Sequence, residues 1–222
     1  MPRKTTNNWK IITLLLLMGA IPSLPGTYIV ISILLGPPAD GSDHAIVRMH
    51  YFLTPVPVVL HCLAGFIFAA LMPFQFSQRL RQRAPNWHRR SGRATLVSVF
   101  LLALTAFWMI AIFPPSGGPL KTASLAVTGV GIIVTFSLSL RAILRRDIAT
   151  HRAWMMRGIA VTYGAVPSVL IYLGWFLLLG EPPLLIDELG RWGGMAFNLA
   201  VVEWVLHRKT RSPLKITQGA TQ

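Results

Sequence analysis

Three histidines lie within or just before long apolar segments of the chain. His61 lies about ten residues into an apolar run, and His88 and His151 each come shortly before another run. An imidazole in such a setting can ligate haem iron, relay a proton or hydrogen-bond a quinone. The alternative is a neutral imidazole bonded to a hydroxyl or carbonyl group of a neighbouring helix. Because ionisable groups inside a bilayer cost about 2.5–3.5 kcal/mol on insertion scales, each one requires a partner or a function.

A haem b site is the sharper of these interpretations. A b-type haem takes two imidazoles from different helices, and His88 and His151 precede two helices expected to run in the same direction. We therefore expect them to be the first pair of ligands. Arg93 and Arg152 would hold the propionates, since a guanidinium pairs with a carboxylate through two hydrogen bonds. His61 is expected roughly 13 Å or more from the inner membrane edge, in a second site or at a quinone.

The segment after His151 has helical periodicity. His151, Trp154, Met155 and Gly158 follow the i, i+3, i+4, i+7 spacing, which predicts that they share one helix face. In the haem interpretation, the small Gly158 admits a planar ring beside the histidine. In the alternative, Trp154 is an interfacial anchor and Gly158 is a helix-packing position.

A second polar group is expected inside the last two apolar runs. Arg157 lies about five residues inside one run, and Glu203 lies about four residues from the inner end of the next. Antiparallel helices would place both side chains at a depth of about 6–8 Å. We predict that they pair or share a polar network, because either charge alone would be costly there. The alternative is that Arg157 snorkels to lipid phosphates, and Asn198 is expected deeper, with hydrogen bonds across helices.

Membrane-spanning helices must position these residues. Of the 222 residues, 53% are hydrophobic and only 13% are charged, whereas an ordinary soluble domain carries about 25% charged residues. We predict an all-α, polytopic integral membrane protein that forms a single membrane domain over residues 1–222. Because the loops are short, spans 2 to 5 are predicted to form an up-down four-helix bundle. The six predicted transmembrane helices cover about residues 9–35, 51–73, 94–113, 120–140, 154–179 and 188–207.

The basic residues gather on one side of these spans. All of the 21 Lys and Arg residues except Arg48, Lys121 and Arg191 fall on that side, so the positive-inside rule places both termini in the cytoplasm. The net charge of +14 therefore indicates topology and contact with anionic lipid headgroups, and not nucleic-acid binding. The Arg-rich stretch 79–93 fits either such headgroups or an anionic pocket. A single cysteine, Cys62, excludes an intrachain disulfide and covalently attached haem.

Several of these motifs together resemble a known family. They are the buried His61, Pro73 and Gln75, then Pro85, His88-Arg89 and Gly92-Arg93, and after two spans His151-Arg152-Ala153-Trp154-Met155-Met156-Arg157. Over about residues 50–175 the chain resembles the domain-of-unknown-function 2306 family of predicted bacterial membrane proteins. The resemblance implies a protein of the bacterial cytoplasmic membrane whose activity is not assigned. The arrangement is also loosely similar to di-haem b-type membrane cytochromes, at the level of fold alone.

Two hypotheses of different classes follow. In the first, the protein binds haem b and exchanges electrons with quinone. In the second, it is a small transporter or a binder of small molecules or lipid, and a homodimer would compensate for its few spans. Its path would be lined by His61, Asn198, Arg157 and Glu203, with carbonyl groups freed at Pro22, Pro25 and Pro167. A membrane-embedded enzyme ranks third, because the chain has few acids and no G-x-S-x-G or H-E-x-x-H motif.

Overall fold

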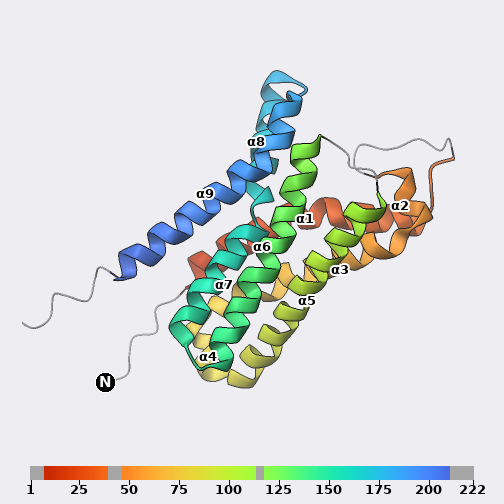
Figure 1. Ribbon diagram of the computed structural model, residues 1–222. Coiled ribbons are helices and arrows are strands. Elements are labelled where there is room, and N and C mark those ends of the chain that lie inside the picture. Colours follow the sequence, from red (N-terminus) through yellow and green to blue (C-terminus); the bar gives the residue numbers. More distant parts are fainter. Residues whose placement is uncertain (1–7, 40–46, 114–117, 211–222) are drawn as a thin grey trace, which may run out of the picture. The chain divides into compact units, whose positions relative to one another are not determined.

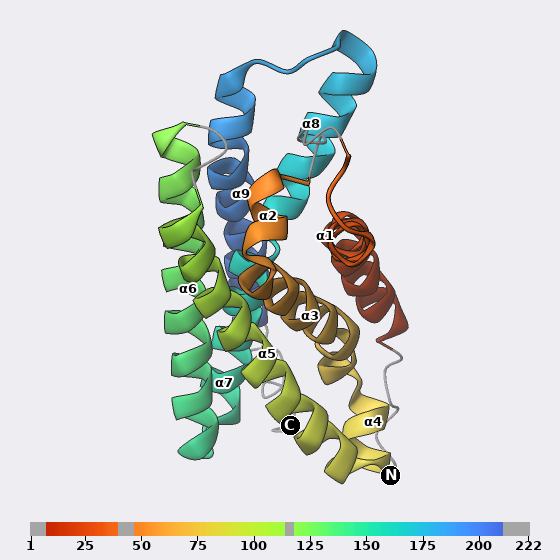
Figure 2. The same ribbon diagram turned by 90° about the vertical axis from the view of Figure 1, so that its right-hand side faces the viewer.

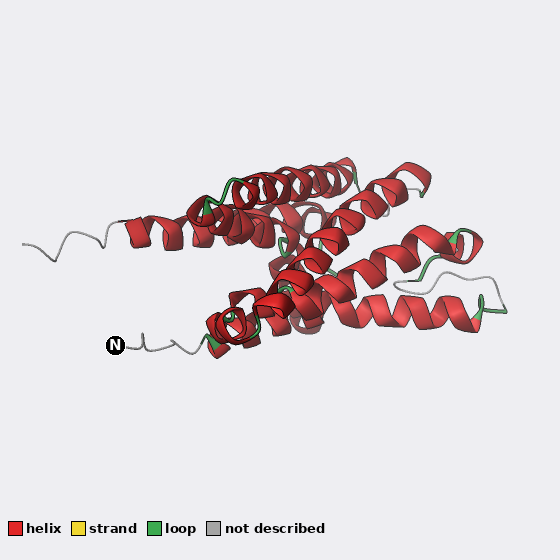
Figure 3. Ribbon diagram, turned by 90° about the horizontal axis from the view of Figure 1, so that it is seen from below, coloured by secondary structure: helices red, strands yellow, loops and turns green. Residues whose placement is uncertain are grey.

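The regular secondary structure is helical throughout the part of the chain that the computed structural model describes, residues 8–39, 47–113 and 118–210 (Figures 1 and 3). The prediction of an all-helical protein is therefore confirmed for these residues. The chain divides into two compact units, Met1–Ser116 and Gly117–Gln222.

The first unit is built around the helix pair α3 and α5. Prolines begin α3, η1 and α5, where a missing N–H removes no helix hydrogen bond. Helix α3 packs against both α5 and α1, and its buried Val58 and Phe68 share the core with Val99 of α5. The elements are α1 (Trp9–Leu35), α2 (Met49–Leu53), α3 (Pro55–Leu71), the 3-10 helix η1 (Pro73–Phe76), α4 (Gln78–Arg83) and α5 (Pro85–Ile112).

Over residues 118–210 the second unit has four helices, of which α9 contacts the other three. Helix α6 packs against α7, and α9 packs against α8, α7 and α6. Figure 2 shows α8 and α9 side by side, joined by a loop at the top. The buried side chains of Ile132 and Phe136 form the core between α6 and α7. The elements are α6 (Pro119–Leu144), α7 (Ile148–Thr162), α8 (Ala165–Leu179) and α9 (Leu184–Thr210).

A tight turn reverses the chain between α6 and α7. The Asp147 N–H donates to the Ala142 carbonyl and the Arg146 N–H to the Ile143 carbonyl, both at 3.0 Å, which is the Schellman pattern. Arg146 occupies the left-handed position of this motif, with φ 61°. Asp147 then caps α7 by accepting from the Thr150 N–H at 3.0 Å. Hydrogen bonds from Thr150 hold the pKa of Asp147 below its ordinary value.

Five segments of the described residues are long and apolar enough to cross a membrane. They correspond to the first five predicted spans. The sixth predicted span, 188–207, lies within α9, which has 27 residues but is not one of the five. Polar side chains such as Asn198 and Glu203 lower its average apolarity. The five segments are Trp9–Leu35, Pro55–Phe76, Pro85–Ile112, Pro119–Leu144 and Ile148–Leu179.

Two of the predicted spans are interrupted. The span expected at 51–73 is divided at Thr54 between α2 and α3, and the span expected at 154–179 is divided between α7 and α8. Helix α1, in contrast, is continuous with both of its prolines inside it. The four-helix bundle of spans 2 to 5 stays a prediction, because these spans are shared between the two units.

The apolar side chains of α1 and α8 remain largely exposed. Leu35 at the end of α1 and Leu178 near the end of α8 each keep 83% of their surface exposed. In water such a surface would favour association, whereas in a bilayer it is the surface that contacts acyl chains. These helices therefore support an integral membrane location.

Candidate functional site

The helical hydrogen-bond ladder is interrupted between α7 and α8. The Gly164 N–H donates within the turn and not to the carbonyl of Ala160, and Pro167 has no N–H to donate to the carbonyl of Tyr163. The side-chain amide of Asn198, on α9, donates to both carbonyls. Its Nδ2 lies 3.3 Å from the Ala160 oxygen and 2.9 Å from the Tyr163 oxygen. The Val166 N–H also donates to the Tyr163 carbonyl at 3.0 Å, so Asn198 replaces the missing donor at Ala160 and adds a second donor at Tyr163.

Glycines allow α9 to approach this interruption closely. A Cβ atom at Gly190 would lie 2.9 Å from the Ser168 Cβ, and one at Gly194 would overlap the carbonyl oxygen of Gly164. Small residues four positions apart are typical of closely packed helix pairs in membranes. The close approach places Asn198 within reach of the backbone at the end of α7.

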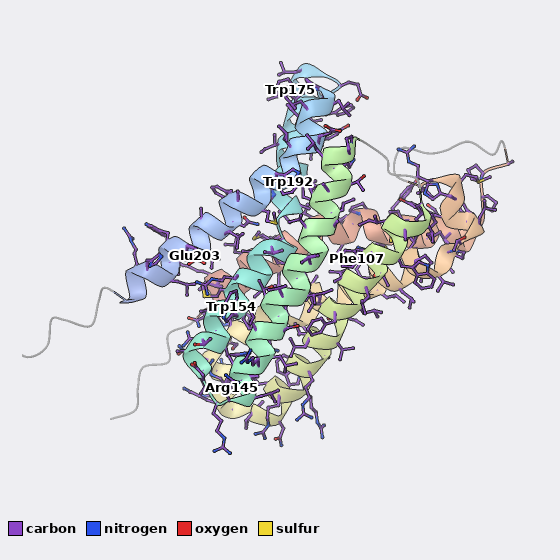
Figure 4. All side chains as sticks on the ribbon, viewed as in Figure 1. Phe107, Arg145, Trp154, Trp175, Trp192 and Glu203 are labelled. Atoms are coloured by element: carbon purple, nitrogen blue, oxygen red, sulfur yellow. The ribbon has the colours of Figure 1, made fainter. Side chains whose placement is uncertain are left out.

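Arg157 of α7 and Glu203 of α9 form a bidentate ion pair. Arg157 Nε donates to Glu203 Oε1 at 2.6 Å and Nη2 donates to Oε2 at 3.0 Å. The side chains are 27% and 38% exposed, respectively. The guanidinium also lies 4.8 Å from the ring centroid of Trp154, and Figure 4 labels Trp154 on α7 and Glu203 on α9. Two parallel hydrogen bonds of this kind fix the relative orientation of the two side chains in addition to pairing their charges.

The structure therefore brings together Arg157 and Glu203 directly, with Asn198 further along the same contact between α7 and α9. We call Trp154, Arg157, Asn198 and Glu203 the α7–α9 polar cluster. At the other end of α9, Trp192 Nε1 donates to the Leu120 carbonyl of α6 at 3.0 Å. Helix α9 is thus attached to its unit by side-chain hydrogen bonds near both ends.

His151 is held in place by α6. Its Nδ1 lies 3.0 Å from the carbonyl oxygen of Ser139 and 2.9 Å from the Ser139 hydroxyl oxygen. Because a carbonyl oxygen can only accept, Nδ1 is the donor in this contact. A partner on Nδ1 is the arrangement that orients metal-binding histidines. A neutral histidine bonded to a neighbouring helix has the same geometry.

His61 has an equivalent partner in the first unit. Its Nδ1 lies 3.0 Å from the Thr105 hydroxyl oxygen on α5. The Thr105 hydroxyl donates its proton to the Leu101 carbonyl at 2.7 Å, so its oxygen accepts from Nδ1–H. His61, like His151, is thus oriented through Nδ1 by a hydroxyl residue of the neighbouring helix.

His88 lies in the first turn of α5. Thr105, which holds His61, is about 26 Å further along the same helix. His61 and His88 therefore cannot ligate the same iron. His151 belongs to the other unit, so its expected pairing with His88 stays a prediction.

The expected propionate partners, Arg93 and Arg152, are both exposed, on α5 and α7 respectively. Within residues 8–39, 47–113 and 118–210, no group of three or more His, Cys, Asp or Glu side chains could hold a metal ion.

The expected common face of α7 is divided between two neighbouring helices. His151 and Gly158 contact α6, whereas Trp154 stacks with Arg157, which pairs with α9. A Cβ atom at Gly158 would lie 2.6 Å from the Phe136 ring. The ring beside Gly158 in the structure is that of Phe136, which gives this glycine a helix-packing role, and its part in a haem site stays a prediction.

The hydroxyl partners of the two histidines were not predicted from the sequence. Thr105 and Ser139 are the last members of two rows of buried hydroxyl residues, one on α5 and one on α6. Several of these hydroxyls also donate to the carbonyl group one turn earlier. The signal visible in the sequence is their spacing of mostly three or four residues. The rows are Ser91, Thr95, Ser98 and Thr105, and Ser124, Thr128, Thr135 and Ser139.

Comparison with known proteins identifies a family. A family model described as Predicted membrane protein (DUF2306) matches residues 58–206, from within α3 to within α9. No curated protein and no solved structure matches the chain. The matched region contains the whole α7–α9 polar cluster and the three histidines His61, His88 and His151.

Proposed function

Since the chain belongs to the DUF2306 family of predicted membrane proteins, we propose that it is a haem b-binding electron-transfer protein of the bacterial cytoplasmic membrane. One observation supports this proposal above the others: Nδ1 of His61 and Nδ1 of His151 are each hydrogen-bonded to a neighbouring helix, which orients both rings. Nε2 is a common site of metal ligation by histidine. His61, His88 and His151 are the candidate ligands, and Arg93 and Arg152 are the candidate propionate partners.

The residues around these imidazoles have a defined part in the proposal. The Ser139 carbonyl and the Thr105 hydroxyl would orient the two rings for ligation. Haem would supply a one-electron carrier, with quinone as the exchange partner.

The visible absorption spectrum of the detergent-purified protein, before and after dithionite, tests the proposal. We expect a Soret band, with longer-wavelength bands that sharpen on reduction, and loss of part or all of this signal in His151→Ala. His207→Ala is the matched control, because His207 is exposed on α9, and it should keep the spectrum. A colourless protein from haem-replete cells would reject haem binding.

The interruption between α7 and α8 favours a second function. We propose, as the alternative, that the α7–α9 polar cluster binds a small solute for transport. Broken helices that present backbone carbonyls are the usual solute sites of transporters. Asn198 occupies these carbonyls as a donor, so a solute that replaced it would carry N–H groups or a positive charge. A homodimer would supply two such sites.

Uptake of methylammonium into liposomes that contain the purified protein tests this alternative. Methylammonium is a small cation whose N–H groups can donate to the carbonyls of Ala160 and Tyr163. We expect uptake above that of protein-free liposomes, and its loss in Asn198→Leu. Gly193→Ala is the control, because a Cβ atom there has no neighbour within 4 Å. Absence of uptake in the wild type would reject the alternative.

Both functions include a sixth span. We propose that α9 crosses the membrane, with the N- and C-termini in the cytoplasm. Helix α9 runs antiparallel to the segment Ile148–Leu179, from Gly190 beside Ser168 to Glu203 beside Arg157. That segment is long and apolar enough to cross a membrane. The internal pairing of Arg157 and Glu203 reduces the cost of placing α9 beside it.

A further inference from the structure

Six exposed arginines surround the bend that joins two candidate spans of the first unit. The bend follows the segment Pro55–Phe76 and leads into Pro85–Ile112. We call these arginines the arginine elbow. They are Arg79, Arg81 and Arg83 on α4, and Arg89, Arg90 and Arg93 on α5.

No carboxylate in the described residues of the first unit balances this charge. Residues 8–39 and 47–113 contain no Asp and no Glu. One local contact is to a neutral acceptor, the Asn86 Oδ1, which accepts from Arg89 Nη2 at 2.5 Å. Within these residues the elbow thus presents positive charge with which an anion could pair.

Hydrogen bonds give the elbow a defined shape. Ser77 Oγ accepts from the Leu80 N–H at 3.2 Å and begins α4. Gln75 Nε2 donates to Ser91 Oγ at 2.8 Å, which ties η1 to the first turns of α5. Because these hydrogen bonds hold the backbone on both sides of α4, the arginine side chains extend from backbone positions that are fixed relative to one another.

The aromatic residues of the elbow indicate its depth. Trp87 packs edge to face against Phe74, with 6.2 Å between ring centroids, and remains 38% exposed. Tryptophan is enriched at the membrane–water boundary. The position of Trp87 therefore favours a place for the elbow near the lipid phosphates.

We propose that the arginine elbow binds the phosphate groups of anionic phospholipids, such as phosphatidylglycerol. Guanidinium groups match phosphate oxygens through two parallel hydrogen bonds. A row of basic residues beside a span attracts anionic lipid within a Debye length. The elbow would bind these lipids whichever function the α7–α9 polar cluster and the histidines have.

Competition between two lipids tests the proposal. The purified full chain is equilibrated with phosphatidylglycerol and phosphatidylcholine of identical acyl chains, and bound lipid is counted by native mass spectrometry. We expect the wild type to retain phosphatidylglycerol in preference. R79Q/R81Q/R83Q should retain about tenfold less of it. R79K/R81K/R83K keeps the charge but not the forked geometry and should retain an intermediate amount.

The control removes the same charge from the turn between α6 and α7. R141Q/R145Q/R146Q changes three exposed arginines of the second unit and should retain nearly as much phosphatidylglycerol as the wild type. An equal loss in this variant, or equal retention of both lipids by the wild type, would overturn the proposal. The wild type supplies a readout that is independent of folding in the variants. Its bound phosphatidylglycerol should fall after a wash at high salt, and unchanged retention would also overturn the proposal.

Discussion

The ion pair of Arg157 and Glu203 joins two helices at a point where either charge alone would be poorly solvated. The depth of each residue in its apolar run was sufficient to predict that the two share a level. The partners of His61 and His151 could not be predicted in this way. A hydroxyl side chain on a neighbouring helix becomes a partner only when the register of the two helices is known, and the register depends on packing.

A double-mutant cycle measures the coupling of this ion pair. We expect Arg157→Gln and Glu203→Gln each to lower the free energy of unfolding by about 1–2 kcal/mol, because each leaves a half-exposed charge without its partner. The double variant should lose about 1 kcal/mol less than the sum of the two. Thermal unfolding in detergent provides the measurement. Arg152→Gln combined with Glu203→Gln is the control and should be additive.

Two adjacent glycines of α9 provide a matched pair of variants. In Gly194→Ala the new methyl group meets the carbonyl oxygen of Gly164, whereas in Gly193→Ala it has no neighbour within 4 Å. We expect Gly194→Ala to destabilise the protein by about 1–3 kcal/mol. Gly193→Ala should be neutral or stabilising by up to about 1 kcal/mol, because alanine favours the helix. Equal melting temperatures of the two variants would contradict the close approach of α8 and α9.

At the scale of the elements, long apolar runs were enough to predict five spanning segments. Their interruptions were harder to locate. Pro22 and Pro25 lie inside a continuous helix, while Pro167 lies three residues beyond a real break. The two cases differ in their tertiary contacts. Near Pro167, Asn198 of α9 donates hydrogen bonds to the backbone at the break, and nothing in the sequence around Pro167 indicates that such a partner is present.

The cap of α7 makes stability depend on pH. Hydrogen bonds from Thr150 lower the pKa of Asp147 in the folded protein. The stabilisation is therefore present above the ordinary pKa of an aspartate and is lost as the pH falls through the lowered value. We expect Asp147→Asn to melt nearly as the wild type does at low pH, and at a lower temperature than the wild type at neutral pH. Melting curves across this acid range check the sign, and a gap that widens on acidification would contradict it.

At the scale of the whole molecule, the uneven distribution of basic residues along the chain favours one orientation in the membrane. The composition alone would not indicate that orientation. The arginine elbow and the turn between α6 and α7 carry most of the described arginines. Each follows one candidate span and precedes another. The prediction that both termini are cytoplasmic also requires that α9 crosses the membrane as a sixth span.

Labelling of single cysteines tests the orientation, after replacement of Cys62 by Ala. We expect cysteines at positions 44 and 115, which lie outside the described residues, to react with an impermeant reagent added from outside the cell. Cysteines at Trp87 and Thr150 should react only from the cytoplasmic side. Labelling of position 115 from the cytoplasm would contradict the six-span topology.

The amide of Asn198 also sets a condition on motion within the second unit. A helix without a continuous hydrogen-bond ladder bends most easily at the gap, which lies between α7 and α8. If the amide moved away, the carbonyl of Ala160 would lose the side-chain donor that now serves it. In an apolar surrounding, an unsatisfied carbonyl costs several kcal/mol. Bending at this point is therefore coupled to hydration, because a water molecule must arrive before Asn198 can leave.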